Sequence, residues 1–151
     1  MATEEIDSLD KLILDQLAEN SRQSFRTLAK KLGVAITTVI NRVEALKEKG
    51  IIKRYSIEID YEKLGYGLSA IIEIEGTRGE TMSLEEKLSK HKNVSAVYDV
   101  TGQVDALIIA KFKSNEELNE FIRSVLVMDE ISKTTTHLVL KVVKEKSCWL
   151  P

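Results

Sequence analysis

The side chains best suited to recognition chemistry lie close together between residues 37 and 42. Thr37, Thr38 and Asn41 are small and polar, and Arg42 follows them. If the segment is helical, Asn41 lies at the centre of an outward arc, flanked by Thr37, Thr38 and Ala45. An asparagine amide can pair with two atoms of adenine, and a threonine methyl can contact the methyl of thymine. The pattern predicts a helix that reads base edges, although an ordinary solvent-exposed face would carry the same residue types.

Basic side chains near this segment are predicted to contact a phosphate backbone. Arg42 lies at the edge of the outward arc, where it can hold a phosphate or instead form an ion pair with Glu44 or near Glu48. Residues 51–60 alternate apolar and polar side chains and predict a strand that serves as wing and tether. Lys53 and Arg54 lie in that strand and can reach the same backbone.

The distribution of charge along the chain also points to a nucleic-acid partner. Residues 20–54 hold nine bases and two acids, whereas residues 1–19 hold six acids and one base. Residues 55–151 hold twelve bases and sixteen acids. A basic block inside an acidic chain is typical of a nucleic-acid-binding head joined to a body that does not bind nucleic acid. Taken alone, it is equally compatible with a solvated basic face.

Several other classes of protein are excluded or disfavoured by composition. No apolar run approaches the roughly 20 residues of a membrane span, and the acidic first residues do not resemble a signal peptide. We therefore expect a cytoplasmic protein. Its single cysteine, Cys148, excludes an internal disulfide and a cysteine-built zinc site, and neither His91 nor His137 has metal-ligand spacing around it. We expect no metal, no cofactor and no catalytic residue.

Three helices are predicted in the first third of the chain. The first covers residues 8–19 with Asp7 as its N-cap, and the second begins after Ser24 and ends at Gly33. The third runs from about Ala35 to Lys49. Two helices joined by a short turn that contains glycine form a helix-turn-helix. The apolar arc of the third helix should face the core; its members are Ile36, Val39, Ile40, Val43 and Leu46.

The remaining residues predict an α+β domain of βαββαβ order. Strands are expected at 68–75, 94–100, 106–112 and 134–143, with helices at 83–91 and 115–126 and a turn at Gly102. Ser114 and Glu117 should form a capping box on the last helix. This order is the ferredoxin-like pattern. Residues 65–70 match a dinucleotide-binding fingerprint formally, but a strand pattern follows where a helix is required, so we reject that interpretation.

The predicted sheet has more apolar surface than two helices can cover. Residues 106–110 and 138–140 are apolar on both faces of their strands. An exposed aliphatic face of this size predicts a partner sheet and hence a homodimer, whose two heads would suit a two-fold symmetric DNA site. RNA-binding sheets of this topology carry aromatic and basic residues instead, so RNA is not the expected ligand.

Taken together, these motifs resemble those of the Lrp/AsnC (feast/famine) transcriptional regulators. The resemblance covers nearly the whole chain, with both domains in the same order. In the head it rests on Leu9-Asp10, Leu14, Leu17, Asn20, Arg22, Ser24, Leu28-Ala29, Leu32-Gly33-Val34, Thr38-Val39, Arg42-Val43, Leu46, Gly50-Ile51-Ile52 and Leu64-Gly65. In the second domain it rests on Val97, Val100-Thr101-Gly102, Asp105, Thr134 and Thr136.

The resemblance implies a transcriptional regulator of double-stranded DNA that forms dimers, then tetramers or octamers, and binds an amino acid between dimers. Carried over by position, the candidate effector residues are Thr101, Gly102, Gln103, Val104, Asp105, Thr134 and Thr136. Hydroxyls, a carboxylate and a glycine turn suit a small zwitterion, although a plain hairpin would show similar residues. The full candidate DNA-binding set is Arg22, Ser24, Thr37, Thr38, Asn41, Arg42, Lys53 and Arg54. One departure from the family is Ala35, which stands where its members usually carry a serine N-cap.

The predicted organisation is a DNA-binding domain at residues 1–51, a tether at 52–65 and an effector-binding and oligomerisation domain at 66–151. Two alternatives have the same architecture. Sirohaem decarboxylases share it, but such an enzyme needs cationic and acid-base groups around a porphyrin, and the acidic second domain offers only two histidines. The other is a ligand-responsive partner of other regulators whose DNA head is weakened, and the basic block argues against it.

Overall fold

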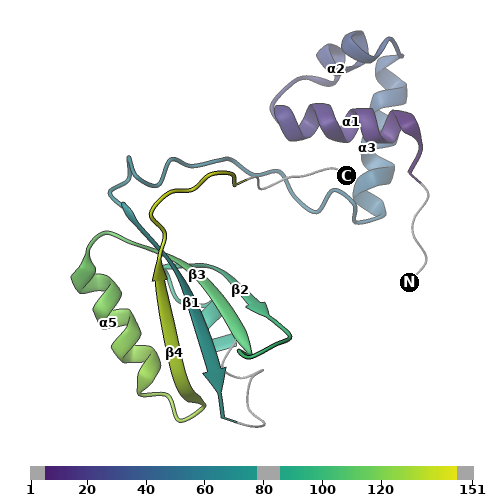
Figure 1. The fold of residues 1–151 in the computed structure, drawn as a ribbon. Helices are drawn as coiled ribbons and strands as arrows, with labels where there is room; N and C mark the ends of the chain where they lie inside the picture. Colours follow the sequence, from purple (N-terminus) through teal and green to yellow (C-terminus); the bar gives the residue numbers. More distant parts are fainter. Residues whose placement is uncertain (1–5, 78–85, 146–151) are drawn as a thin grey trace. The chain divides into compact units, whose positions relative to one another are not determined.

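The computed structural model describes residues 6–77 and 86–145, and these fall into two compact units. One unit is formed mainly by Met1–Glu58 and the other by Ile59–Val143. Figure 1 shows the helices of the first unit and the sheet of the second. Each unit has a hydrophobic core of its own.

Within its described residues, the first unit has three helices, α1 (Ser8–Glu19), α2 (Phe25–Leu32) and α3 (Ile36–Glu48). The Asp7 side chain accepts a hydrogen bond from the Asp10 N–H at 2.9 Å, and the Asp10 carboxylate accepts one from the Asp7 N–H, which closes a capping box. Gly33 ends α2 in the left-handed region, with φ of 68°. The predicted helices and turn are therefore confirmed.

The core of this helical head is small and aliphatic. One side chain from α1, one from α2 and two from α3 are fully buried; these are Ile13, Leu28, Val39 and Val43. Leu17, Ala29 and Leu46 extend the same cluster. Because complete burial of one such aliphatic side chain contributes about 1.5–3 kcal/mol, this cluster holds α3 against the two other helices.

The second unit is a four-stranded antiparallel sheet with the strand order β2-β3-β1-β4. Its strands are β1 (Leu68–Gly76), β2 (Val94–Asp99), β3 (Ala106–Phe112) and β4 (Ile131–Leu138). Helix α5 (Asn115–Leu126) packs on one face (Figure 1). Residues 86–89 are helical as well, and the rest of the predicted helix at 83–91 lies partly outside the described residues. The ferredoxin-like order is confirmed.

The two faces of this sheet differ in burial. Ile72, Ile74, Ile108 and Phe112 are fully buried and pack with residues of α5 such as Phe121. On the other side, Leu107 and Ile109 are half-buried, Ile71 is 37% exposed and Tyr98 is 53% exposed. We call this second side the open face; it carries Ile71, Glu73, Tyr98, Leu107, Ile109 and His137.

Two strand predictions were wrong: one predicted strand does not form, and another has different bounds. Residues 51–60 form no strand, because among the described residues no neighbouring strand takes up their hydrogen bonds. The last strand is Ile131–Leu138 rather than 134–143. It pairs with β1, and its hydrogen bonding stops where the Val139 N–H reaches the Ser69 carbonyl, since β1 begins at Leu68. At its other end the pairing continues to Ile131, opposite Gly76.

The capping of α5 also differs from the prediction. The Ser114 hydroxyl caps the helix by accepting from the Glu117 N–H, as expected. The Glu117 carboxylate, however, accepts from the Lys113 N–H at 2.8 Å and from the Asn93 side chain at 3.1 Å, not from Ser114. It therefore ties the start of α5 to the segment before β2.

Within the described residues, no helix is long and apolar enough to cross a membrane.

Candidate nucleic-acid and effector sites

The helix that is predicted to read DNA, α3, begins without a side-chain cap. Ala35 occupies the N-cap position with φ of −67° and ψ of 147°. Ser24, the N-cap of α2, has nearly the same backbone (φ −71°, ψ 149°), and its hydroxyl accepts from the Thr27 N–H at 3.1 Å. The backbone at Ala35 is therefore already in the capping conformation, and only the hydroxyl is missing.

The exposed arc of α3 is rotated from the predicted one. Thr37 and Asn41 are exposed, as expected, but Thr38 and Ala45 are half-buried. Ile36 and Ile40, which were predicted to face the core, are 40% and 38% exposed. Helices α1 and α2 enclose Val39, Val43 and Leu46, and the arc that they cover does not extend to the two isoleucines. The surface beside Thr37 and Asn41 is consequently apolar.

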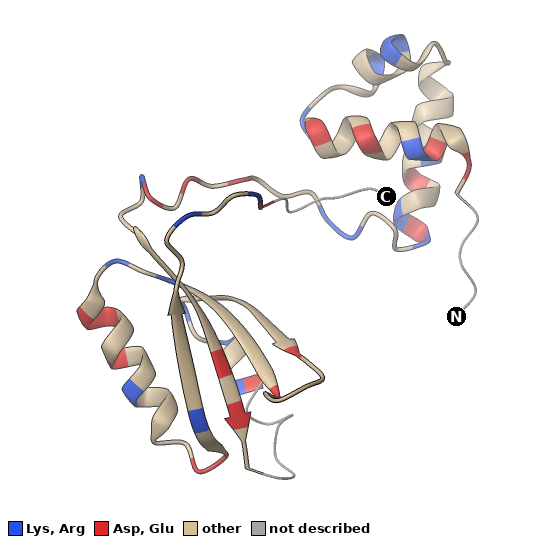
Figure 2. Ribbon diagram, viewed as in Figure 1, with Lys and Arg blue, Asp and Glu red and all other residues tan. Residues whose placement is uncertain are grey.

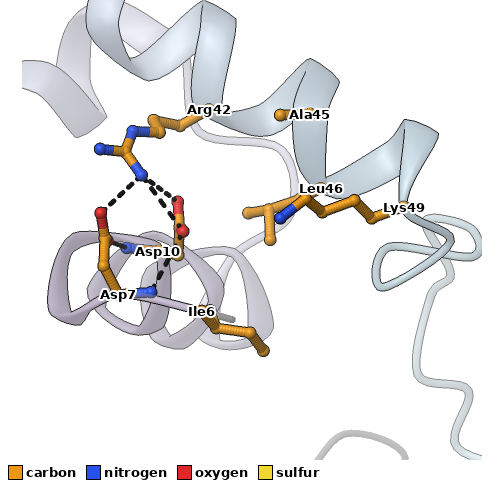
Figure 3. A pocket seen from close by; sticks show the side chains of 7 residues that line it. All are labelled: Ile6, Asp7, Asp10, Arg42, Ala45, Leu46 and Lys49. Atoms are coloured by element: carbon orange, nitrogen blue, oxygen red, sulfur yellow. Dashed lines mark hydrogen bonds and ion pairs between the residues drawn. The ribbon is translucent and has the colours of Figure 1, made fainter. Parts of the chain in front are cut away.

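Arg42 forms ion pairs that join α3 to the beginning of α1. Its Nη1 lies 2.6 Å from Asp7 Oδ2 and 3.3 Å from Asp10 Oδ2 (Figure 3). The Asp10 N–H and then Arg42 hold the pKa of Asp7 below its ordinary value, and Asp7 is the main cause that raises the pKa of Arg42. The predicted ion-pair alternative thus had the wrong partners, since Glu44 pairs with Lys47 instead. The contact favours a positioning role for Arg42.

These charged groups border an open hollow between α1 and α3, which is also lined by Ile6, Ala45, Leu46 and Lys49 (Figure 3). In Figure 2 the ribbon marks acidic residues spaced along α1, and Lys and Arg on α2 and after the end of α3. Arg22, Lys53 and Arg54 are exposed, as a phosphate contact requires. Ser24 is exposed too, but its hydroxyl already bonds to Thr27.

In the second unit, Asp105 is held at the end of β1. Its N–H donates to the Ile74 carbonyl at 2.9 Å, and its Oδ2 accepts from the Gly76 N–H at 2.7 Å. Thr134 lies opposite Ile74 on the other side of β1. The sheet thus brings Asp105 and Thr134 to the two sides of one strand, about 10 Å apart at ordinary strand spacing.

The other predicted effector residues lie along the same edge or on β4. Gly102 has φ of 136°, and Thr101, Gly102 and Gln103 form an exposed turn before Val104, which is half-buried. Thr136 is exposed and lies opposite Ile72, on the same side of the sheet as Thr134.

In the part of the chain that the structure describes, no cluster of three or more His, Cys, Asp or Glu side chains could hold a metal ion.

Family models match both units. Residues 6–53 match a winged helix-turn-helix DNA-binding domain, and residues 69–148 match the Lrp/AsnC ligand binding domain. The chain belongs to the Lrp/AsnC family of DNA-binding transcriptional regulators. Its relatives include an uncharacterised HTH-type transcriptional regulator of Pyrococcus furiosus, 47% identical over 93% of this chain and 95% of the relative. The HTH-type transcriptional regulator FL11 of the same organism is 34% identical over 93% of both chains.

Solved structures of the Lrp/AsnC family have the same fold. Escherichia coli AsnC is 31% identical and superimposes with a TM-score of 0.88 over 96% of this chain and 99% of AsnC. A Neisseria meningitidis transcriptional regulator, solved as a complex with L-Met, is 23% identical, with a TM-score of 0.90 over 97% of both chains. At that identity the second comparison concerns the fold alone.

In this Lrp/AsnC regulator, the sequence pattern did not identify Ile36 and Ile40 as surface residues or Asp7 and Asp10 as partners of Arg42. Helical periodicity placed both isoleucines on the same arc as Val39 and Val43, so the sequence held no signal that they are exposed. The acidic residues at the start of α1 were recognised only as helix-capping groups. A basic residue on α3 facing them could have been anticipated only from the three-dimensional packing.

Proposed function

We propose that this chain is a cytoplasmic, sequence-specific regulator that inserts α3 into the major groove and changes its assembly or DNA affinity when it binds an amino acid. The observation that carries the proposal is the exposure of Thr37 and Asn41 on α3 in a head with a net positive block. Small polar side chains there suit base edges, and Arg22, Lys53 and Arg54 suit phosphates. Three further residues remain in the predicted DNA-binding set, namely Thr38, Ser24 and Arg42. Thr38 is half-buried, the Ser24 hydroxyl bonds to Thr27, and Arg42 is paired with Asp7, so DNA would compete with these contacts.

A homodimer through the open face is part of this proposal. The open face exposes Ile71 and Tyr98 beside half-buried Leu107 and Ile109, and a second copy would cover this apolar surface. Two strand-patterned segments, 51–60 and 139–143, also have no neighbouring strand among the described residues, apart from the bond of the Val139 N–H to the Ser69 carbonyl, and Leu140 is 99% exposed. Pairing with a second copy would satisfy both, and tetramers or octamers would follow from further contacts.

The amino-acid site is proposed at the turn 101–105 and on β4. Most of these side chains are open to solvent in a single copy, which favours a site completed by another copy. Thr101, Gln103 and Thr136 can bind the carboxylate of the amino acid, and Asp105, which uses one carboxylate oxygen for Gly76, can use the other for its ammonium group. The relatives named above are transcriptional regulators, which disfavours a sirohaem-decarboxylase-like enzyme; we propose no catalytic role.

DNA binding is tested by gel shift of the full chain against a randomised duplex pool, with salt titrated from 50 to about 300 mM, a span over which phosphate contacts lose much of their affinity. We expect enrichment of a limited set of sequences and a fall in affinity with salt. Asn41→Ala should remove discrimination at one base position, by about 1–3 kcal/mol. Binding without sequence preference or salt dependence would contradict the proposal.

Effector binding is tested separately by a thermal-shift screen of the twenty amino acids. A ligand at 100 times its Kd stabilises the folded state by about 2.7 kcal/mol, so a true effector should raise the melting temperature measurably. Thr136→Val keeps the shape of the side chain and removes its hydroxyl, and it should weaken the response. If no amino acid shifts the transition, the sensing part of the proposal fails while DNA binding stands.

A further inference from the structure

The exposed side of α3 carries a polar stripe that is longer than the pair of residues assigned to DNA above. Thr37, Asn41, Glu44 and Glu48 follow one another at spacings of four, three and four residues, and all four are exposed. Residues at these spacings lie above one another on one side of a helix. A helix that inserts Thr37 and Asn41 into a groove therefore brings Glu44 toward the same DNA surface.

The local electrostatics reduce the repulsion between Glu44 and a phosphate backbone. Lys47 Nζ lies 2.9 Å from Glu44 Oε1, and this ion pair is the main cause that raises the pKa of Lys47. The same ammonium lies 5.8 Å from the centroid of the Tyr55 ring. The charge of Glu44 is thus partly balanced by the ammonium group of Lys47, which the Tyr55 ring helps to hold in place. Its second oxygen, Oε2, accepts no hydrogen bond from the residues that the structure describes.

If α3 lies along the major groove, the spacing along the helix would bring Glu44 to the base pair next to the one that Asn41 would read. Three residues correspond to about 4.5 Å along a helix, against a base-pair rise of about 3.4 Å. A carboxylate in the major groove accepts a hydrogen bond from the N4 amino group of cytosine, whereas it is repelled by the acceptor atoms O6 and N7 of guanine. A free oxygen at that position thus fits cytosine.

We propose that Glu44 is a second specificity-determining residue, which accepts a hydrogen bond from cytosine N4 in the base pair adjacent to the one read by Asn41. The proposal rests on the proposed function and names part of the DNA sequence that the head selects. The competing explanation is a solvated ion pair that only lowers the affinity for every DNA sequence alike. The two differ in whether the effect of Glu44 depends on the base.

The experiment is binding-site selection from a randomised duplex with the full-length chain and four variants of it: Asn41→Ala, E44A, E44Q and E48Q. The wild type should select cytosine beside the position whose preference Asn41→Ala abolishes. E44A should lose that cytosine preference, by roughly 10- to 100-fold relative to the other bases, and leave the remaining positions unchanged. E44Q should change the preference to adenine, because a glutamine amide pairs with adenine N6 and N7.

E48Q is the matched control, since it removes the same charge from the same side of α3 one turn further along. It should raise the affinity for all sequences by a similar factor without changing any base preference. Far-UV circular dichroism of each variant verifies that the head is folded, which the exposure of both glutamates favours.

Equal effects of E44A, E44Q and E48Q on every sequence would overturn the role of Glu44 and leave the proposed function intact. If the wild type itself shows no sequence preference, the proposed function is overturned, and the role of Glu44 with it. A cytosine preference that survives E44A would show that another side chain reads that base pair, and this too refutes the inference.

Discussion

Replacement of Ala35 by serine should stabilise the recognition helix, and the size of the effect follows from the structure. The backbone at Ala35 (φ −67°, ψ 147°) matches that of Ser24 (φ −71°, ψ 149°), so a serine needs no rearrangement there. In α2 the Ser24 hydroxyl accepts a hydrogen bond from the Thr27 N–H, with 3.1 Å between Oγ and N. By analogy, the new serine hydroxyl would accept a hydrogen bond from the N–H of Thr38. That N–H is among the first of the helix and has no intrahelical acceptor.

A serine N-cap is worth about 1 kcal/mol relative to alanine, within a range of about 0.5–2 kcal/mol. At 25 °C, 1 kcal/mol changes an equilibrium constant about fivefold, and it shifts the melting temperature of a domain of 60–100 residues by about 4–8 °C. Because Ala35 is exposed, the hydroxyl loses little hydration when it forms the bond. The gain should therefore appear almost undiminished in the head.

The assay is hydrogen exchange of the full-length chain, read at the amides of the first turn of α3, together with urea unfolding. Ala35→Ser should slow exchange at Thr38 several-fold and raise the free energy of unfolding of the head. Ser24→Ala is the mirror-image control, since it removes an existing cap from α2 and should cost a similar amount. The double variant should come close to the wild type, because the two caps lie on different helices.

The missing cap would not limit the stability of α3 if Ala35→Ser left exchange in α3 unchanged while Ser24→Ala accelerated exchange in α2. That result would mean that tertiary packing of Val39 and Val43, rather than the missing cap, sets the stability of the first turn. A more ordered first turn should also hold Thr37 and Thr38 in place before DNA binds. We accordingly expect Ala35→Ser to increase specific DNA affinity by at most about fivefold, the factor that corresponds to 1 kcal/mol.

Three further predictions concern packing, protonation and assembly. Phe121→Ala should destabilise the sheet unit by about 3–5 kcal/mol in urea unfolding, because this side chain is 3% exposed and its ring lies 5.5 Å from that of Phe112. Burial, and to a smaller extent Lys92, lowers the pKa of His91 below 6.5. The contribution of His91 to the free energy of unfolding should therefore be complete above pH 6.5 and be lost as the pH drops through the folded-state pKa. His91→Gln should flatten this pH dependence, and an unchanged slope would contradict the prediction. Ile71→Lys should shift the chain toward smaller species in sedimentation velocity because it charges the open face, whereas Val127→Lys, at an exposed site after α5, should not.

Much of the fold could be predicted from the sequence because the relevant interactions are local. Asp7, Ser24 and Ser114 cap helices through N–H groups three residues away, and Gly33 ends α2 through its own backbone freedom. Runs of aliphatic residues predicted β1 and β3, and in the structure alternate residues of each strand are buried on one face. The boundaries of these elements required no knowledge of their neighbours.

What only the tertiary structure decided depends on residues far apart in the chain. The ion pair of Arg42 with Asp10 spans 32 residues, and the hydrogen bond from Gly76 to Asp105 spans 29. The exposure of Ile36 and Ile40 follows from the limited arc that α1 and α2 cover, and the end of β4 follows from where β1 begins. Periodicity specifies which residues share one side of an element, but how much of that side is covered depends on the neighbouring elements, whose positions the local sequence does not encode.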